Sequence, residues 1–187
     1  MIRLTDLQSS RSVIDDLAHA FDFNIDRASH DYSWIRLTPE HRFLVIAGES
    51  TGGAFLAYGN GDFDQAPILY VTSEGTAGKL ASNLGELLAI VLAVPYWEEL
   101  LKFSAGGDVE EMRKTAELSL ENFEEDEIAT SAKIRLIKAL DIKEISDPIG
   151  LLHQNVKSTD CTVVAEDGWR YESLFNTFTS HDMRRWC

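Results

Sequence analysis

The sequence is poor in the residues that mark several special structural classes. Two cysteines, Cys161 and Cys187, occur among 187 residues. This number is too small for a disulfide framework, and the two do not have the spacing of metal ligands. The longest apolar stretch, residues 87–96, is far shorter than the roughly 20 residues of a membrane span. We therefore expect no disulfide scaffold, no metal, no cofactor and no membrane-spanning helix.

Basic residues are also scarce. The chain has 17 Lys and Arg against 31 Asp and Glu, a formal net charge of −14. This excess argues against direct binding to nucleic acid and favours either a basic partner or solubility alone. Asp6, Asp15 and Asp16 interrupt the N-terminal stretch in which a signal peptide needs a continuous apolar core. We expect a soluble protein of the reducing cytoplasm, with neither nucleic acid nor membrane as its partner.

The sequence does contain one well-patterned unit, within residues 42–103. A length of 187 residues suits a single domain that buries roughly 70 % of its unfolded surface. Residues 43–47, 54–58 and 68–72 are short apolar runs rich in β-forming side chains, and glycine-containing turns separate them. We predict a meander of three antiparallel strands.

After these strands the apolar period becomes helical, over residues 84–92. Glu86 follows Asn83 by three residues, as in a capping box, so the helix should begin there. Pro95 lacks the amide proton that a continuous helix uses, so the helix should end just before it. We expect this helix to bury Leu88 against the sheet. A second apolar turn follows, formed by Tyr96, Trp97, Leu100, Leu101 and Phe103.

Weaker patterns flank this unit. Residues 9–21 carry apolar side chains at four-residue spacing and predict a helix that covers the sheet. Residues 31–37, shortly before Pro39, predict an edge strand. In the C-terminal segment, 147–187, we expect a short helix at 149–156, a strand at 161–164 and a helical turn at 169–175.

Acidic residues are concentrated between Asp108 and Glu127. This stretch holds nine acidic and two basic residues, a net charge of −7, which is half that of the chain. Apolar residues keep helical spacing through it, and a second, more basic helical pattern follows. We predict an acidic helical hairpin over residues 108–140. The expected buried stripe of its first helix is Val109, Met112, Ala116, Leu120 and Phe123.

Three segments of the central unit occur in an order known from one protein family. They are Gly52-Gly53-Ala54-Phe55, Pro67-Ile68-Leu69-Tyr70 and Ala81-Ser82-Asn83-Leu84-Gly85-Glu86-Leu87-Leu88. In this order the chain resembles the SUKH superfamily, which groups yeast cell-wall-synthesis regulators with many bacterial immunity proteins. The resemblance covers about a third of the chain. It implies a one-layer sheet with helices packed on it, and a binding role without catalysis.

The resemblance also implies a partner. For bacterial members, this partner is a secreted toxin from a neighbouring cell, often a nuclease or deaminase with a basic cleft for nucleic acid. An acidic inhibitor can cover such a cleft, because its carboxylates take the place of phosphates. A regulatory scaffold in a cell-envelope pathway is the alternative role that the same family suggests.

One motif points to catalysis instead. Gly48-Glu49-Ser50-Thr51-Gly52 fits the G-x-S-x-G pattern of a nucleophile elbow, which needs a strand before the serine and a helix after it. The run at 54–58 that follows is strand-like, so we favour a hairpin turn. A small serine hydrolase that uses Ser50, completed by His153 or His181, remains the alternative from a different class.

Two further patterns fail as ligand sites. Gly75-Thr76-Ala77-Gly78-Lys79 lacks the first glycine and the final hydroxyl of a phosphate-binding loop. Asn60, Asp62 and Asp64 alternate like calcium ligands, but Val71 stands where the loop needs its glutamate. We interpret both stretches as turns.

The interpretation that we favour is a single α+β domain with a small, mostly antiparallel sheet flanked by helices. We expect it to act by binding a basic protein, as an immunity protein that neutralises a toxin. The candidate partner-binding residues are acidic: Glu117, Glu121, Glu124, Glu125 and Asp126 in the predicted hairpin, and Asp62, Asp64 and Glu74 in the turns. A field of one sign speeds association with a cationic partner, although a merely solvated acidic face has the same composition.

Overall fold

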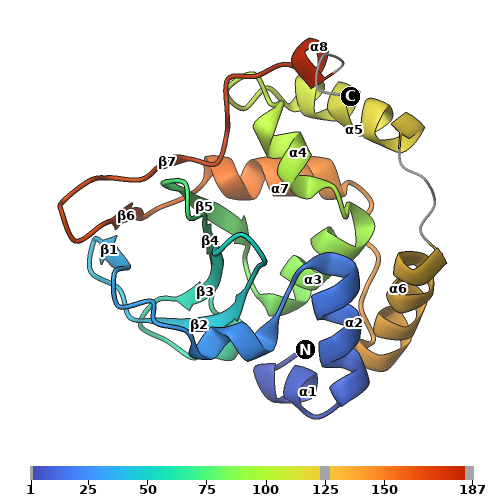
Figure 1. Cartoon of the computed structure of the whole chain (residues 1–187), viewed down its shortest axis with the longest axis horizontal. Coiled ribbons are helices and arrows are strands. Elements are labelled where there is room, and N and C mark those ends of the chain that lie inside the picture. The colour runs from blue at the N-terminus through green and yellow to red at the C-terminus, as the bar shows by residue number, and fades with distance from the viewer. Residues whose placement is uncertain (1, 123–126, 184–187) are drawn as a thin grey trace.

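Helices pack against one side of a five-stranded sheet in the computed structural model of the chain (Figure 1). The structure describes residues 2–122 and 127–183, without the side chains of residues 121 and 122. The α-helices are α1 (Leu4–Gln8), α2 (Arg11–Phe21), α3 (Leu84–Ala93), α4 (Trp97–Lys102), α5 (Val109–Asn122), α6 (Glu127–Leu140), α7 (Pro148–Lys157) and α8 (Ser180–Met183). Two 3₁₀ helices are η1 (Ile25–Ser29) and η2 (Phe63–Gln65). No helix within these residues is both long and apolar enough to cross a bilayer.

The main sheet has the strand order β2-β3-β4-β5-β7. Its strands are β2 (Phe43–Gly48), β3 (Ala54–Tyr58), β4 (Ile68–Val71), β5 (Thr76–Ala81) and β7 (Glu172–Ser173). The first four are antiparallel neighbours, and β7 pairs parallel to β5. A separate antiparallel pair joins β1 (Arg36–Thr38) to β6 (Thr162–Val164). This confirms the predicted α+β class, the mostly antiparallel sheet and the meander.

The two central strands are buried on both faces, because every residue of β3 and β4 is buried. Phe55 and Tyr70 belong to the large core on the side of the sheet that the helices cover. Leu56 and Leu69 belong to a smaller core on the other side, together with Val163 of β6. The sheet is therefore the middle layer, with helices on one face and the β1–β6 pair on the other.

Helix α3 forms as its sequence predicts. The side chain of Asn83 accepts a hydrogen bond from the Glu86 amide at 3.0 Å, and the Glu86 carboxylate accepts one from the Ser82 amide at 3.0 Å. The helix ends at Ala93, before Pro95. The core residues expected here are buried, with relative exposures of 0 % for Leu88, 2 % for Val91 and 3 % for Trp97.

The two helices of the acidic stretch form as predicted, but among the described residues they do not pack against each other as a hairpin. Helix α6 packs against α2, where Arg135 donates to Asp16 at 2.6 and 2.9 Å, whereas α5 packs against α4, α7 and α8 (Figure 1). Leu120, expected in the buried stripe, is 62 % exposed. Met112 and Ala116 of the expected stripe are buried, and Thr115 and Ser119 complete the buried face of α5. Phe123 lies outside the described residues.

Several weaker expectations also need correction. The stretch 75–79, which we interpreted as a turn, instead contains the first part of β5, which begins at Thr76. The helical turn expected at 169–175 is wrong, because this segment contains β7. The edge strand expected at 31–37 is only the three-residue β1, and it pairs with β6 instead of the main sheet. Helices α2 and α7 and strand β6 confirm the remaining expectations.

Packing of the C-terminal segment explains why β5 was missed. A Cβ atom added to Gly78 would lie 2.9 Å from Leu174 Cδ1, so the glycine lets Leu174 lie directly on β5. This contact joins residues that are far apart in the sequence, and local periodicity does not contain it. Residue 78 therefore resembles a turn glycine in the sequence while it serves as a strand residue in the structure.

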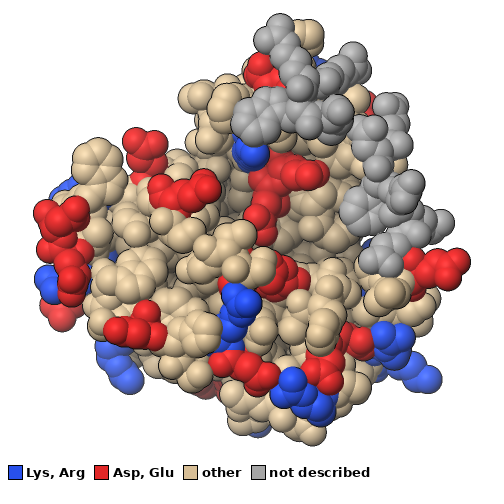
Figure 2. Space-filling model, viewed as in Figure 1, with Lys and Arg blue, Asp and Glu red and all other residues tan. Residues whose placement is uncertain are grey.

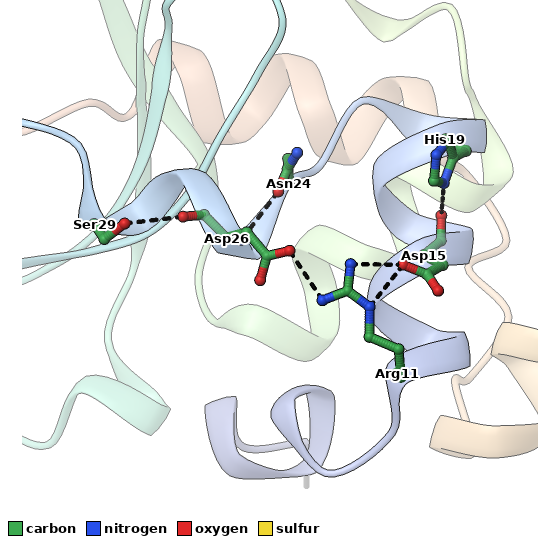
Figure 3. A network of polar contacts seen from close by, with 6 residues as sticks. All are labelled: Arg11, Asp15, His19, Asn24, Asp26 and Ser29. Atoms are coloured by element: carbon green, nitrogen blue, oxygen red, sulfur yellow. Dashed lines mark hydrogen bonds and ion pairs between the residues drawn. The ribbon is translucent and has the colours of Figure 1, made fainter.

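Exposed polar contacts tie α2 to η1 (Figure 3). Arg11 donates to Asp15 at 2.9 Å and to Asp26 at 3.0 Å, and Asn24 accepts from the Asp26 amide at 3.0 Å. Exposed ion pairs are each worth about 0–1 kcal/mol, so their main effect is on the path of the chain. The connection that they hold in place contains Asp22, which belongs to the site described next.

The packing of α3 gives a first prediction, that Leu88→Ala lowers the free energy of unfolding by about 2–5 kcal/mol, through lost burial and the cavity left behind. Chemical denaturation measures this change. The matched control is Ile134→Ala on α6, where the side chain is 64 % exposed, and where a change of about 0.5 kcal/mol or less is expected. A loss below about 1 kcal/mol for Leu88→Ala would contradict the packing of α3 on the sheet.

Candidate functional site

A cleft of about 380 Å³ lies between helix α4 and the end of the sheet where β4 turns into β5. We call it the α4 cleft. It is lined by Thr51, Tyr70, Thr72, Ser73, Glu74, Thr76, Trp97, Glu98, Glu99, Leu101, Lys102, Leu174 and Asn176. Figure 2 shows this side of the molecule, where acidic side chains gather in the hollow beside α4.

Aromatic rings form the inner wall of the α4 cleft. Tyr70 of β4 and Trp97 of α4 meet edge to face, with ring centroids 5.0 Å apart and planes at 85°. Phe55 of β3 packs behind both, at 4.9 Å from Tyr70 and 6.3 Å from Trp97. All three residues are buried. The wall is therefore rigid, because each ring is held by the two others and by the central strands.

A buried carboxylate lies next to this wall. Glu49, at the end of β2, is 3 % exposed. Its carboxylate accepts hydrogen bonds from the Thr51 amide and hydroxyl, both at 2.5 Å, and from the Gly53 amide at 2.6 Å. These donors replace the water that a carboxylate loses when it is buried.

The close approach of Gly53 makes this arrangement possible. A Cβ atom at residue 53 would lie 2.5 Å from Glu49 Oε1 and 3.0 Å from the Val71 carbonyl oxygen. Any side chain there would therefore displace the Glu49 carboxylate or the backbone of β4. The glycine pair before β3 is thus explained by the buried charge as well as by the turn.

A second carboxylate joins the turn from outside. Asp22 follows α2, and its carboxylate accepts hydrogen bonds from the Ser50 amide at 3.0 Å and from the Ser50 hydroxyl at 2.5 Å. Ser50 lies between β2 and β3, so the helix that a nucleophile elbow needs is missing here. His153, one of the two histidines considered for a triad, hydrogen-bonds instead to the Gly107 carbonyl oxygen at 2.9 Å. Ser50 therefore acts as a link between the turn and α2.

Glu98 completes the acidic group from the first turn of α4. Burial of its carboxyl, followed by the negative charges of Glu49, Asp22 and Glu99, raises its pKa to about 7, although part of the residue is exposed. Burial and the same carboxylates, with that of Glu98 first, also raise the pKa of the Tyr70 hydroxyl. Both shifts have the same two causes, which are burial first and the negative field of the neighbouring carboxylates second.

The balance of charge at the mouth of the α4 cleft is negative. Glu74, Glu98 and Glu99 line it, and Lys102 is the one basic residue among its lining residues. Glu99 accepts a hydrogen bond from the Ser119 hydroxyl at 3.2 Å, so its carboxylate is held in place from α5. The arrangement can hold a cationic group between carboxylates and beside aromatic rings.

The structure brings one of the sequence-predicted site residues, Glu74, into the α4 cleft. Asp62 instead accepts a hydrogen bond from the Asp64 amide, and Asp64 accepts one from the Leu4 amide at 3.1 Å, so both hold the chain near η2. Glu117 is exposed on α5. The side chain of Glu121, and all of Glu124, Glu125 and Asp126, lie outside the described residues.

The sequence did not mark Tyr70, Trp97, Glu98 and Glu99 of the α4 cleft as site residues, nor the carboxylates of Asp22 and Glu49 beside it. Glu98 and Glu99 lie in the first turn of α4, where acidic residues are common because they complement the helix dipole, so they give no local signal of a site. The other members come from separate segments, and the fold alone brings them together.

Other chemical groups in the described chain do not form a reactive centre. Burial raises the pKa of the half-buried Cys161 thiol to about 11, which keeps it protonated at neutral pH. Cys187 lies outside the described residues. Within the described residues, no three His, Cys, Asp or Glu side chains are arranged to hold a metal ion.

Comparison of the chain with known proteins identifies no related protein. No protein-family model, no curated protein and no solved structure matches this chain. Function must therefore be inferred from the α4 cleft itself and from the sequence resemblance described above.

The raised pKa of Glu98 leads to a second prediction, in which stability depends on pH. The folded state holds the Glu98 proton more tightly than the unfolded state, whose glutamate has the ordinary pKa of 4.5. The contribution of Glu98 to the free energy of unfolding is therefore full below about pH 4.5 and is lost as the pH rises through about 7. We expect Glu98→Gln to be more stable than the wild type at pH 8 and to lose this advantage below pH 4.5.

Thermal or chemical unfolding across this pH range tests the prediction. Glu117→Gln on the exposed face of α5 removes the same charge and serves as the control. If both variants show the same pH dependence, Glu98 does not experience the acidic field described above.

Proposed function

We propose that this protein is a non-catalytic binding module that receives a basic segment of a partner protein in the α4 cleft. The observation that supports it is the convergence of Glu74, Glu98 and Glu99 on a cavity with a rigid aromatic wall. The buried Glu49 and the neighbouring Asp22 strengthen the negative field from behind. Together these groups fit an arginine or lysine side chain.

The energetic argument concerns repulsion between carboxylates. Like charges held close together raise the free energy of the unbound protein, and at Glu98 their repulsion adds to the effect of burial in raising the pKa. A guanidinium or ammonium group that enters the cleft relieves this repulsion and gains charge-assisted hydrogen bonds. An arginine also packs its planar face on aromatic rings, so the aromatic wall favours arginine over lysine.

The role as an immunity protein of the cytoplasm is the more specific part of the proposal. It depends on the resemblance to the SUKH superfamily, which implies a secreted toxin with a basic surface. The net charge of −14 is consistent with such a partner, because opposite charges speed encounter between two proteins. In this role the α4 cleft would hold a basic side chain of the toxin.

The acidic helix α5 is the competing surface, but several of its charges are already used within the protein. Glu111 accepts hydrogen bonds from Lys114 at 2.6 Å and from the Ser180 hydroxyl at 2.8 Å, and its pKa is lowered by these partners. Glu110 lies 3.7 Å from Arg113. These pairs reduce the field that α5 presents to a partner. We therefore place the interface at the α4 cleft.

The third prediction concerns association with a cognate toxin, which the proposed role requires and which a neighbouring gene would encode. The cleft variant Glu74→Gln, Glu98→Gln, Glu99→Gln keeps the size of three side chains and removes their charge. We expect it to bind at least about tenfold more slowly at low salt, because the steering field is lost. The difference should shrink as salt shortens the screening length, which is about 8 Å at physiological ionic strength.

A matched variant on α5 makes this test decisive. Glu110→Gln, Glu117→Gln, Glu121→Gln removes the same number of charges from α5, and stopped-flow association measures both variants. A slow α5 variant with a normal cleft variant would move the interface to α5. Normal rates for both would overturn the proposal that charge guides the partner.

The fourth prediction is that binding at pH 7 releases protons. A bound cation lowers the pKa of Glu98, which is about half protonated at this pH in the free protein. We expect release of roughly half a proton per complex, measured as a dependence of the calorimetric enthalpy on the ionisation enthalpy of the buffer. Glu98→Gln should abolish the release. Proton release that persists in this variant would place the cation elsewhere.

A further inference from the structure

A second cavity, of about 560 Å³, lies on another part of the molecule. It is bounded by the start of α3, by Ile2 near the N-terminus and by residues 141–145, which connect α6 to α7. We call it the α3 groove. It shares no lining residue with the α4 cleft. Its volume falls within the range of about 300–1,000 Å³ that is typical of ligand sites.

The walls of the α3 groove are aliphatic. Ile2, Leu140, Ile142, Ile145 and Leu151 line it, and each is only partly buried at the edge of the large core. These side chains come from four different parts of the chain and face one space. Aliphatic side chains that stay partly exposed together favour burial by a partner, because the apolar surface gains free energy when it leaves water.

The rim of the α3 groove is acidic. Four carboxylates and one lysine line it, a net charge of −3. Lys143, the lysine, is already paired with Asp141 at 2.8 Å. Glu144 is exposed, and within the described residues its carboxylate has neither a hydrogen bond nor an ion pair. A ligand that complements this rim carries positive charge.

The backbone along one wall is also open. In the part of the chain that the structure describes, the amides of residues 143–146 donate no hydrogen bond to backbone or side-chain acceptors. These residues belong to neither a helix nor a strand. Loop amides of this kind can donate hydrogen bonds to the carbonyl groups of a bound peptide.

We propose that the α3 groove docks an extended protein segment that combines aliphatic side chains with at least one Lys or Arg. The aliphatic side chains contact the walls, the basic group contacts the acidic rim, and the peptide backbone pairs with residues 143–146. The argument rests on the shape, charge and backbone of this groove and is independent of the α4 cleft. It extends the proposed function by giving the protein a second, more apolar docking site.

Matched synthetic peptides test the chemistry of this site. The probe is a fluorescein-labelled octapeptide of alternating Leu and Lys, compared with one in which Ser replaces Leu and one in which Glu replaces Lys. Fluorescence anisotropy at physiological salt should give a Kd at least about tenfold lower for the Leu/Lys peptide than for either control. If the Ser/Lys peptide bound as tightly as the Leu/Lys peptide, the aliphatic walls would contribute nothing and attraction to the negatively charged protein would explain the binding. This result would overturn the proposal.

Variants and spectroscopy then locate the bound peptide. Asp141→Asn, Glu144→Gln removes two rim charges, and Asn tolerates the φ of 49° at residue 141. We expect this variant to bind the Leu/Lys peptide about tenfold more weakly, whereas Glu40→Gln, Glu166→Gln, which removes two exposed charges elsewhere, should bind normally.

Amide NMR signals of residues 143–146 should shift when the Leu/Lys peptide is added to the wild-type protein. This readout does not depend on any substitution. Shifts confined to Glu74, Glu98 and Glu99 would assign the peptide to the α4 cleft and overturn the α3 groove as a docking site. Loss of binding in the cleft variant would lead to the same conclusion, whereas normal binding there supports the α3 groove even if the α4 cleft has no partner.

Discussion

The burial of β3 and β4 on both faces is the constraint on which the rest of the structure depends. A sheet without a polar face cannot be left open to water, so the chain must cover it twice. Helices cover one face, with Phe55 and Tyr70 in the large core. The β1–β6 pair covers the other face, over Leu56 and Leu69. Helix α4 is held against the end of the sheet because Trp97 packs on Tyr70 and Phe55, and the α4 cleft follows from that contact.

The same packing explains why carboxylates lie close together at this point. The turn between β2 and β3 supplies donors to Glu49 from its own backbone, so the charge is held beside the aromatic wall. Asp22 is fixed there by Ser50, and Glu98 is fixed by the position of α4. These three carboxylates repel one another when they are charged, so none of them stabilises the charged form of the others. A fold that holds them together against their repulsion is typical of a binding or catalytic site.

The sequence predicted what depends on neighbouring residues. Strands β2, β3 and β4 and the cap of α3 follow from periodicity and from Asn83 and Glu86, which act within one turn. Strand β5 could not be predicted in this way, because Gly78 is a strand residue only where Leu174 packs on it. The α4 cleft was largely hidden for the same reason. Asp22, Glu49 and Glu98 belong to three segments, and no local pattern shows that they meet.

Charge in the sequence was therefore an incomplete guide to the site. The stretch from 108 to 127 has half of the net charge, yet in α5 Glu110 and Glu111 pair with Arg113 and Lys114. The residues Glu74, Glu98 and Glu99 of the α4 cleft are exposed as well, but the carboxylates of Glu49 and Asp22 add to the negative field at Glu98 from behind. The strength of an acidic surface depends on how its charges are paired as well as on their number, and in this protein the pairing within α5 favours the α4 cleft.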